Sequence, residues 1–359
     1  MTKPDPSKPT ETTDEVPPFV PHPWLAGGHR QTIFARYWSW PRPRIDSTYA
    51  EVDVDHGDFV SVLESIPRGW QPGDPSAILV HGLGGCARSP YVVRVAKRLV
   101  ERGNTRVVRM NLRGAGSGFG SARSYYHSGK TEDLRRVAAW LARRAGGSPI
   151  ALVGFSLGAN LVLKLAGEAA SDPVEALDCV VAANPPVDLG ACCRAIQNPG
   201  NRIYDKNFVR LLRDEVGRLH ARFPELGLVD LSSAQTLLAF DELYTAPRNG
   251  YLHAQDYYDR CGANRWIEQI QVPGLVIHAL DDPFIPMESF SAIRFPAHLS
   301  CEFVPHGGHL GYWSRQAWDG DRRWLDARIG HWLASRWQSS RCDPLAATRK
   351  FVSDKDLPL

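Results

Sequence analysis

A strand, a tight turn and a helix meet at the residues Gly154-Phe155-Ser156-Leu157-Gly158. The apolar run at 150–153 precedes this turn and the apolar segment 161–166 follows it, which indicates a buried strand leading into a buried helix. A serine at the tip of such a turn has a strained backbone, and a side chain in place of either glycine would crowd the turn. This context is typical of a nucleophile elbow, so we predict Ser156 to be a nucleophile. The alternative is an ordinary Gly/Ser turn before a buried helix.

Strand and helix patterns alternate along the chain from residue 77. We predict strands at 77–80, 106–112, 150–155, 177–183, 275–280 and 301–304, and helices at 90–100, 131–145, 157–169 and 318–337. Thr131 is the expected N-cap of the second helix. A β-hairpin at 47–66 precedes the alternation. The pattern predicts the α/β class, with a mostly parallel central sheet flanked by helices on both faces.

One interval of about 90 residues, between the strands near Val180 and Val276, is much longer than a single crossover needs. Its helical segments near 203–223 and 233–244 suggest a cap or lid insertion at about 186–262, over the carboxyl ends of the strands, where ligands bind in open α/β sheets. The alternative is an insertion remote from the site. We place the domain at 19–338, between disordered tails at 1–18 and 339–359. The aromatic segment 19–45 is expected to wrap irregularly over the body.

The composition of the chain limits the kinds of partner that it could bind. The chain has 359 residues, 43% of them hydrophobic, and a net charge of +3, which is too small to suggest nucleic acid or an anionic membrane as partner. No apolar run approaches the length of a spanning helix, although peripheral membrane contact through the aromatic N-terminal segment is conceivable. Seven cysteines without paired spacings, and an N-terminus without an apolar signal core, favour a cytoplasmic protein. The sequence predicts no oligomeric state.

A serine hydroxyl needs an imidazole to take its proton, and the imidazole needs a carboxylate to hold its tautomer. Candidate carboxylates are Asp281 and Asp282, which follow the predicted strand at 275–280. We choose Asp282, because the segment 282–286 resembles the D-x-x-x-P loop common in α/β-hydrolases; Asp281 would then cap or orient the loop. The alternative is a pair of aspartates in an ordinary turn.

The imidazole is expected after the last strand, in the order Ser, Asp, His. His309 follows Gly307-Gly308, which would let the loop approach the serine closely, and His306 is the alternative. A zinc site at Cys301, His306 and His309 lacks a second ligand cluster, so we predict neither a metal nor a cofactor.

The tetrahedral intermediate of acyl transfer needs two backbone N–H groups. We assign one to Leu157, which follows the serine at a helix N-terminus, and the other to Leu83 in the loop His81-Gly82-Leu83-Gly84-Gly85. The alternative, a phosphate-binding glycine loop, lacks the later glycine of G-x-G-x-x-G.

Taken together, the motifs resemble the YheT-like branch of the α/β-hydrolase superfamily. The ordered set is His81–Gly85, Asn111–Gly114, Tyr126–Gly129, Gly154–Asn160, Asp281–Phe284 and Gly307–His309, with further likeness at 24–32, 240–247 and 257–258. Ala159 departs from the glycine of many relatives. The resemblance implies an α/β-hydrolase fold with a Ser156–Asp282–His309 triad. It assigns no role to Arg113 or the 126–129 loop, which we expect to brace the site.

The resemblance also implies a carboxylic-ester hydrolase that acts on a small-molecule ester, with short- to medium-chain acyl esters or acylglycerols as substrates, through an acyl-enzyme. The first alternative is an acyltransferase that forms esters from an acyl donor and an alcohol. The second is a non-catalytic binding module on the same scaffold. Apolar residues in the 186–262 interval suggest a hydrophobic acyl pocket, or equally the core of a lid.

Overall fold

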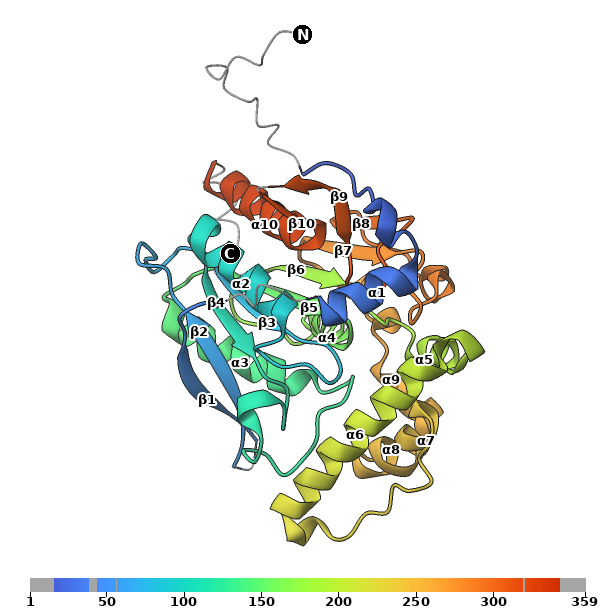
Figure 1. The fold of residues 1–359 in the computed structure, drawn as a ribbon. Helices are drawn as coiled ribbons and strands as arrows, with labels where there is room; N and C mark the ends of the chain where they lie inside the picture. The colour runs from blue at the N-terminus through green and yellow to red at the C-terminus, as the bar shows by residue number, and fades with distance from the viewer. Residues whose placement is uncertain (1–15, 39–43, 56, 319, 343–359) are drawn as a thin grey trace, which may run out of the picture.

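The computed structural model describes residues 16–38, 44–55, 57–318 and 320–342 (Figure 1). Eight strands form one sheet in the order β1-β2-β4-β3-β5-β6-β7-β8. Their bounds are β1 (Thr48–Asp55), β2 (Asp58–Ser65), β3 (Ser76–Val80), β4 (Arg106–Met110), β5 (Ile150–Phe155), β6 (Leu177–Ala183), β7 (Gly274–Ala279) and β8 (Leu299–Val304). All neighbours from β4 to β8 are parallel, whereas β2 is antiparallel to both β1 and β4. The predicted hairpin and mostly parallel sheet are confirmed.

Helices cover both faces of this sheet. Helices α2 (Pro90–Gly103) and α10 (Trp324–Cys342) pack on one face, and α3 (Thr131–Ala145) and α4 (Leu157–Glu168) pack on the other. Short 3-10 turns are η1 (Pro23–Leu25), η2 (Gly116–Gly118), η3 (Pro199–Asn201), η4 (Pro224–Leu226), η6 (Ala263–Arg265), η7 (Ile267–Gln269) and η8 (Met287–Phe290). In the part of the chain that the structure describes, no helix combines the length and the apolar character that crossing a bilayer requires.

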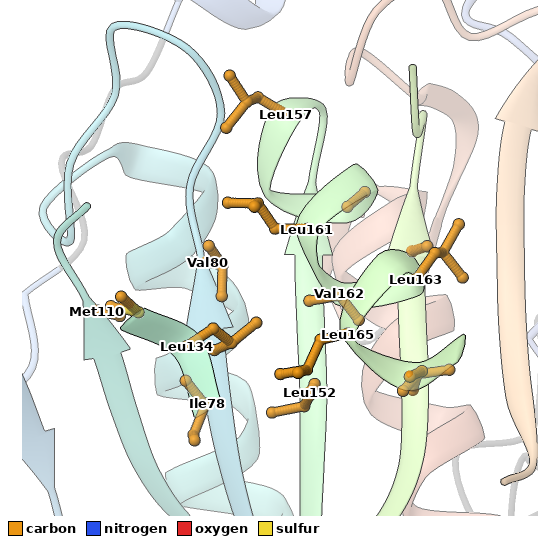
Figure 2. Packing of buried hydrophobic residues seen from close by; sticks show 14 of the residues in the cluster. Ile78, Val80, Met110, Leu134, Leu152, Leu157, Leu161, Val162, Leu163 and Leu165 are labelled. Atoms are coloured by element: carbon orange, nitrogen blue, oxygen red, sulfur yellow. The ribbon is translucent and has the colours of Figure 1, made fainter. Parts of the chain in front are cut away.

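The two-residue period of the strands divides the core into two layers. In β3, Ile78 and Val80 belong to the layer under α3 and α4, whereas Ala77 and Leu79 belong to the layer under α2 and α10. Figure 2 shows the first layer, in which Leu152 of β5 lies beside Leu165 of α4 and Ile78 of β3 lies beside Leu134 of α3. Each fully buried side chain of this size contributes roughly 1.5–3 kcal/mol. The carboxyl ends of the strands are thereby held at one fixed edge.

The interval between β6 and β7 contains five helices that gather at one side of the sheet (Figure 1). They are α5 (Leu189–Gln197), α6 (Arg202–Arg222), α7 (Leu237–Phe240), α8 (Ala246–Arg248) and α9 (Ala254–Cys261), with a π-helical turn, η5 (Asp241–Thr245), between α7 and α8. We call residues 186–262 the cap segment.

Three local expectations are wrong. The segment 19–45 is not irregular throughout, because it contains the helix α1 (Gly28–Tyr37). The closing helix begins at Trp324 rather than 318, since the strands β9 (Trp313–Trp318) and β10 (Asp321–Arg323) pair antiparallel before it. Thr131 is the first residue of α3 and not its N-cap; its hydroxyl donates a 2.7 Å hydrogen bond to Glu168 at the end of α4.

The predicted tails lie mostly outside the described residues. Where the structure reaches the N-terminal tail, it is tied to the body. The carbonyl of Pro17 accepts a 2.7 Å hydrogen bond from the indole of Trp324. Helix α10 continues through Cys342, four residues past the predicted domain boundary at 338.

Candidate active site

Ser156 lies at the junction of β5 and α4 with a strained backbone, φ 53° and ψ −123°. The glycines on either side are sterically required, as expected. A Cβ at Gly154 would lie 2.3 Å from the carbonyl oxygen of Gly158, and a Cβ at Gly158 would lie 2.3 Å from that of Val80. Both distances are far below contact, so only glycine fits, and the turn holds the serine hydroxyl at the carboxyl edge of the sheet.

The structure brings Ser156, His309 and Asp282 together from three loops that follow β5, β8 and β7. The Nε2 atom of His309 lies 2.9 Å from the Ser156 Oγ atom, and its Nδ1 atom lies 2.8 Å from Oδ2 of Asp282. These contacts fix the tautomer: Nδ1–H donates to the carboxylate, and Nε2 is left to accept the serine proton.

Asp282 is buried and has several donors. Besides His309, Asn184 donates a 2.6 Å hydrogen bond to its Oδ2, and the backbone N–H of Phe284 donates a 2.8 Å bond to its Oδ1. Burial alone would raise the pKa of Asp282, but the adjacent His309 and the N–H of Phe284 hold it below its usual value. The carboxylate therefore stays charged beside the imidazole.

Asp281 and His306, the alternatives for the acid and the base, form a contact of their own. Asp281 Oδ1 accepts a 2.8 Å hydrogen bond from the N–H of Gly308, and its Oδ2 lies 3.2 Å from Nδ1 of His306, which is half-exposed. Asp281 thus orients the loop that carries His309, the secondary role considered for it from the sequence.

The Leu83 and Leu157 amides are available at the serine. In the 82–85 loop, Gly82 donates to the hydroxyl of Tyr91 at 3.0 Å, Gly84 donates to that of Tyr126 at 2.9 Å, and Gly85 donates to the carbonyl of Gly82 at 3.0 Å. Within the described residues, the N–H of Leu83 has no acceptor. Leu157, as the first residue of α4, has no intrahelical acceptor either. Both groups can therefore bind an oxyanion.

His81 holds the same loop from behind. Its Nδ1 lies 2.8 Å from the Gly82 carbonyl, and its Nε2 accepts a 3.1 Å hydrogen bond from the N–H of Leu112. Complete burial lowers the pKa of His81 to about 4, so its ring is neutral and can make both contacts. The imidazole is a structural link between the loops after β3 and β4.

Several residues that support the triad were not identified as site residues from the sequence. Thr32 of α1 accepts a 2.8 Å hydrogen bond from the backbone N–H of His309 and donates a 2.7 Å bond to the carbonyl of Gly28. Tyr312 donates a 2.8 Å bond to Oδ1 of Asn184, which directs the amide of Asn184 toward Asp282. Asn184 and Tyr312 lie in none of the motifs described above, whereas Thr32 lies in the 24–32 segment of the family resemblance, which assigned it no role.

Arg113 is fully buried and its ion pairs brace the body, although not the loops around the site that the sequence suggested. Its guanidinium donates to both carboxylate oxygens of Asp133 at 2.7 Å, to Asp58 at 2.8 Å and to Asp55 at 2.9 Å. These bonds tie α3 to the β1–β2 hairpin.

The 126–129 loop is held in a similar way. Tyr257 accepts a 3.0 Å hydrogen bond from the N–H of Ser128, and Asn160 donates a 2.9 Å bond to the carbonyl of Ser128. The loop thus links the body to α9 of the cap segment.

Two cavities meet at Ser156 and His309. The inner cavity, of about 110 Å³, lies under the cap segment and is mostly apolar; its walls include Leu157, Leu189, Ile196, Leu212, Leu237 and Phe240. The outer cavity, of about 570 Å³, lies between α1, α6 and the 82–85 loop. Leu83, Phe208 and Phe284 border both cavities. The serine thus borders a small, mostly apolar cavity and a larger cavity.

Comparison with known proteins agrees with this geometry. The family described as "alpha/beta hydrolase fold" matches residues 75–316. YheT of Escherichia coli, which carries the name of an esterase, is 31% identical over 331 residues that cover 90% of this chain and 95% of YheT. A monoacylglycerol lipase of Saccharomyces cerevisiae is 27% identical over 262 residues, 70% of this chain and 57% of the lipase.

Among solved structures, the Pyrococcus furiosus esterase Pf2001 superposes with a TM-score of 0.53 at 16% identity, covering 81% of this chain and 93% of that one. At this identity the likeness shows the fold alone. The family match over more than half of the chain, and the likeness to YheT along nearly its whole length, show that the chain belongs to the α/β-hydrolase family, in the branch of YheT.

Proposed function

We propose that the protein is a serine carboxylic-ester hydrolase with Ser156, His309 and Asp282 as its catalytic triad. The single observation that carries the proposal is the 2.9 Å contact between Ser156 Oγ and His309 Nε2, at a serine with two unpartnered amides beside it. The names of the relatives, an esterase and a monoacylglycerol lipase, support the same reaction class.

The steps follow from the geometry. Ser156 Oγ attacks the ester carbonyl carbon as His309 Nε2 takes its proton, and the anionic Asp282 stabilises the resulting imidazolium. The Leu83 and Leu157 N–H groups bind the oxyanion. The imidazolium then protonates the leaving alcohol, which leaves an acyl-serine. Water, deprotonated by the same imidazole, releases the acid and restores the hydroxyl.

The inner cavity supports an acyl pocket. A cavity of about 150 Å³ in a protein core can hold benzene, so a space of about 110 Å³ fits an acyl chain of only a few carbons. We therefore narrow the proposed acyl groups to short chains. The alcohol part of the ester would occupy the outer cavity.

The test compares Ser156→Ala with Ser171→Ala, an exposed serine after α4. On p-nitrophenyl butanoate, Ser156→Ala is expected to lose on the order of 10⁴–10⁶ in kcat, because the triad acts as a unit. Ser171→Ala should keep the parental rate, and a fluorophosphonate should label the parent but not Ser156→Ala. Parental turnover by folded Ser156→Ala would refute the proposal.

The acyl-serine can also be attacked by an alcohol, which would make the protein an acyltransferase. The wide outer cavity leaves room for an alcohol acceptor. The test adds butanol to the same assay and measures the amounts of butyl butanoate and butanoate. Their ratio shows how the acyl-enzyme divides between transfer to the alcohol and hydrolysis. Ester as the main product at butanol concentrations far below that of water would favour transfer over hydrolysis.

A further inference from the structure

The charged side chains that line the outer cavity are all positive, and the ester-hydrolase mechanism does not use them. Four cationic side chains line it: Arg36, Arg94, Lys206 and Arg210. None of the described residues that line this cavity is an aspartate or a glutamate. The inner cavity, which also borders Ser156, has no lysine or arginine among its described lining residues.

Three of the four cations are not neutralised by the protein. Arg94 forms a 2.5 Å ion pair with the buried Asp326. For Arg36, Lys206 and Arg210, by contrast, no carboxylate in the described ranges lies within ion-pair distance, and Arg210 donates only to the neutral amide of Asn207, at 3.0 Å. Their charges are therefore available to a ligand in the cavity.

The cations come from two helices that face each other. Arg36 lies on α1, and Lys206 and Arg210 lie four residues apart on α6, so they share one face of that helix. The helices meet where His29 stacks on Tyr204, with ring centroids 5.7 Å apart and Nδ1 3.1 Å from the tyrosine hydroxyl. In Figure 1, α1 and one end of α6 accordingly lie close together beside the sheet. Like charges at this spacing weaken a helix, which a bound anion would offset.

We propose that the outer cavity binds an alcohol part that carries a phosphate monoester, so that the preferred substrates are short-chain acyl esters of phosphorylated alcohols. The inference rests on the proposed ester hydrolysis. A phosphate monoester brings nearly two negative charges and three strong acceptor oxygens, which suits three cations better than a single carboxylate does. A volume of about 570 Å³ is within the range of small-molecule sites.

The test uses two esters with the same acyl chain, 1-butanoylglycerol and 1-butanoylglycerol 3-phosphate. At low ionic strength, kcat/KM is expected to be about tenfold or more higher for the phosphate ester, since each partly exposed charge pair contributes a few-fold. Added NaCl should reduce this ratio, because salt screens exposed charges. Inorganic phosphate should compete only weakly, because it lacks the acyl group.

The decisive variant is Arg36→Gln/Lys206→Gln/Arg210→Gln. Its ratio of phosphate-ester to neutral-ester kcat/KM should fall about tenfold, towards unity. The matched control, Arg136→Gln/Arg143→Gln/Arg265→Gln, removes the same charge from exposed positions away from the cavity and should keep the parental ratio. Melting temperatures of both variants exclude unfolding as the cause.

The failures are distinguishable. If the parent hydrolyses the neutral ester through Ser156 but shows no preference for the phosphate ester, or if the two triple variants have the same ratio, the phosphate subsite is overturned and the hydrolase proposal stands. If neither ester is hydrolysed faster than by Ser156→Ala, the hydrolase proposal itself fails.

Discussion

Asp281 and Asp282 are neighbours in sequence, yet their carboxylates have different partners. Asp282 accepts from the imidazole of His309 and from two backbone amides at the start of the next turn, whereas Asp281 accepts from Gly308 and faces His306. Because adjacent residues leaving a strand point in different directions, only one of the two can reach the imidazole.

The pair gives a sharp prediction. Asp282→Asn should lower kcat by on the order of 10³–10⁴, because an amide can favour the wrong imidazole tautomer. Asp281→Asn should cost about tenfold or less, through a looser 307–309 loop. Steady-state kinetics on one ester, with melting temperatures for both variants, measures this. A larger loss in Asp281→Asn would exchange the two roles.

Residues at the strand ends could be predicted because parallel strands place their carboxyl ends at one edge. Ser156 and His309 follow from that rule together with their glycines. The supporting roles of Thr32, Asn184 and Tyr312 could not be predicted, since they depend on contacts between segments far apart in the sequence. Asn184 also has a left-handed backbone, φ 47°, which its sequence neighbours do not indicate.

At the scale of elements, local patterns predicted the strands and helices whose faces are buried by the sheet. Helix α1 and the β9–β10 pair were missed. Contacts with a distant segment hold α1 in place: Gln31 donates to the Trp313 carbonyl and accepts from its N–H, although the two residues are 282 positions apart in the chain. Pairings of this kind leave no periodic signal in a short stretch of sequence.

The cap segment supplies many of the residues that line the inner cavity, the proposed acyl pocket. Leu237 of α7 borders the inner cavity and is only partly buried where it packs against the core, so shortening it enlarges the cavity at its wall. We expect the parent to hydrolyse esters with acyl chains of two to four carbons faster than octanoyl esters.

Leu237→Ala should move this preference toward longer chains by about tenfold in relative kcat/KM, since each buried CH₂ contributes about 0.8 kcal/mol. A p-nitrophenyl ester series measures the shift. Leu228→Ala, a change at an exposed cap residue, serves as the control. An unchanged profile in Leu237→Ala would show that the acyl chain lies elsewhere.

At the scale of the whole molecule, burial of titratable groups makes stability depend on pH. Burial lowers the pKa of His81 and His278 to about 4 and that of His127 to about 3. Their unfolded pKa is about 6.5, so between pH 6.5 and 4 the unfolded chain binds protons that the folded protein does not. Stability from these groups is present above pH 6.5 and is lost as the pH falls.

Asp241, in the wall of the inner cavity, changes stability with pH in the opposite direction to the histidines. Burial raises its pKa to about 6, although Thr245 and Tyr258 donate hydrogen bonds to it. Below pH 6 the folded protein binds this proton more tightly than the unfolded chain, so the Asp241 contribution grows on acidification. Three histidines outweigh one aspartate, so these four groups together favour unfolding in acid.

The contribution of a single buried histidine to the pH dependence of stability can be measured at His278. This residue lies in β7, and its ring centroid is 4.8 Å from that of Phe290. His278→Phe keeps an aromatic ring there but removes the titration. The parent should lose stability between pH 6.5 and 4.5, and His278→Phe should lose about 2–3 kcal/mol less over the same range, at about 1.4 kcal/mol per pKa unit. Urea unfolding at closely spaced pH values gives both curves, and His298→Gln, at an exposed ring, provides the control. Parallel curves for the parent and His278→Phe would mean that the pKa of the His278 ring is the same in the folded and the unfolded protein, against the direction that its burial imposes.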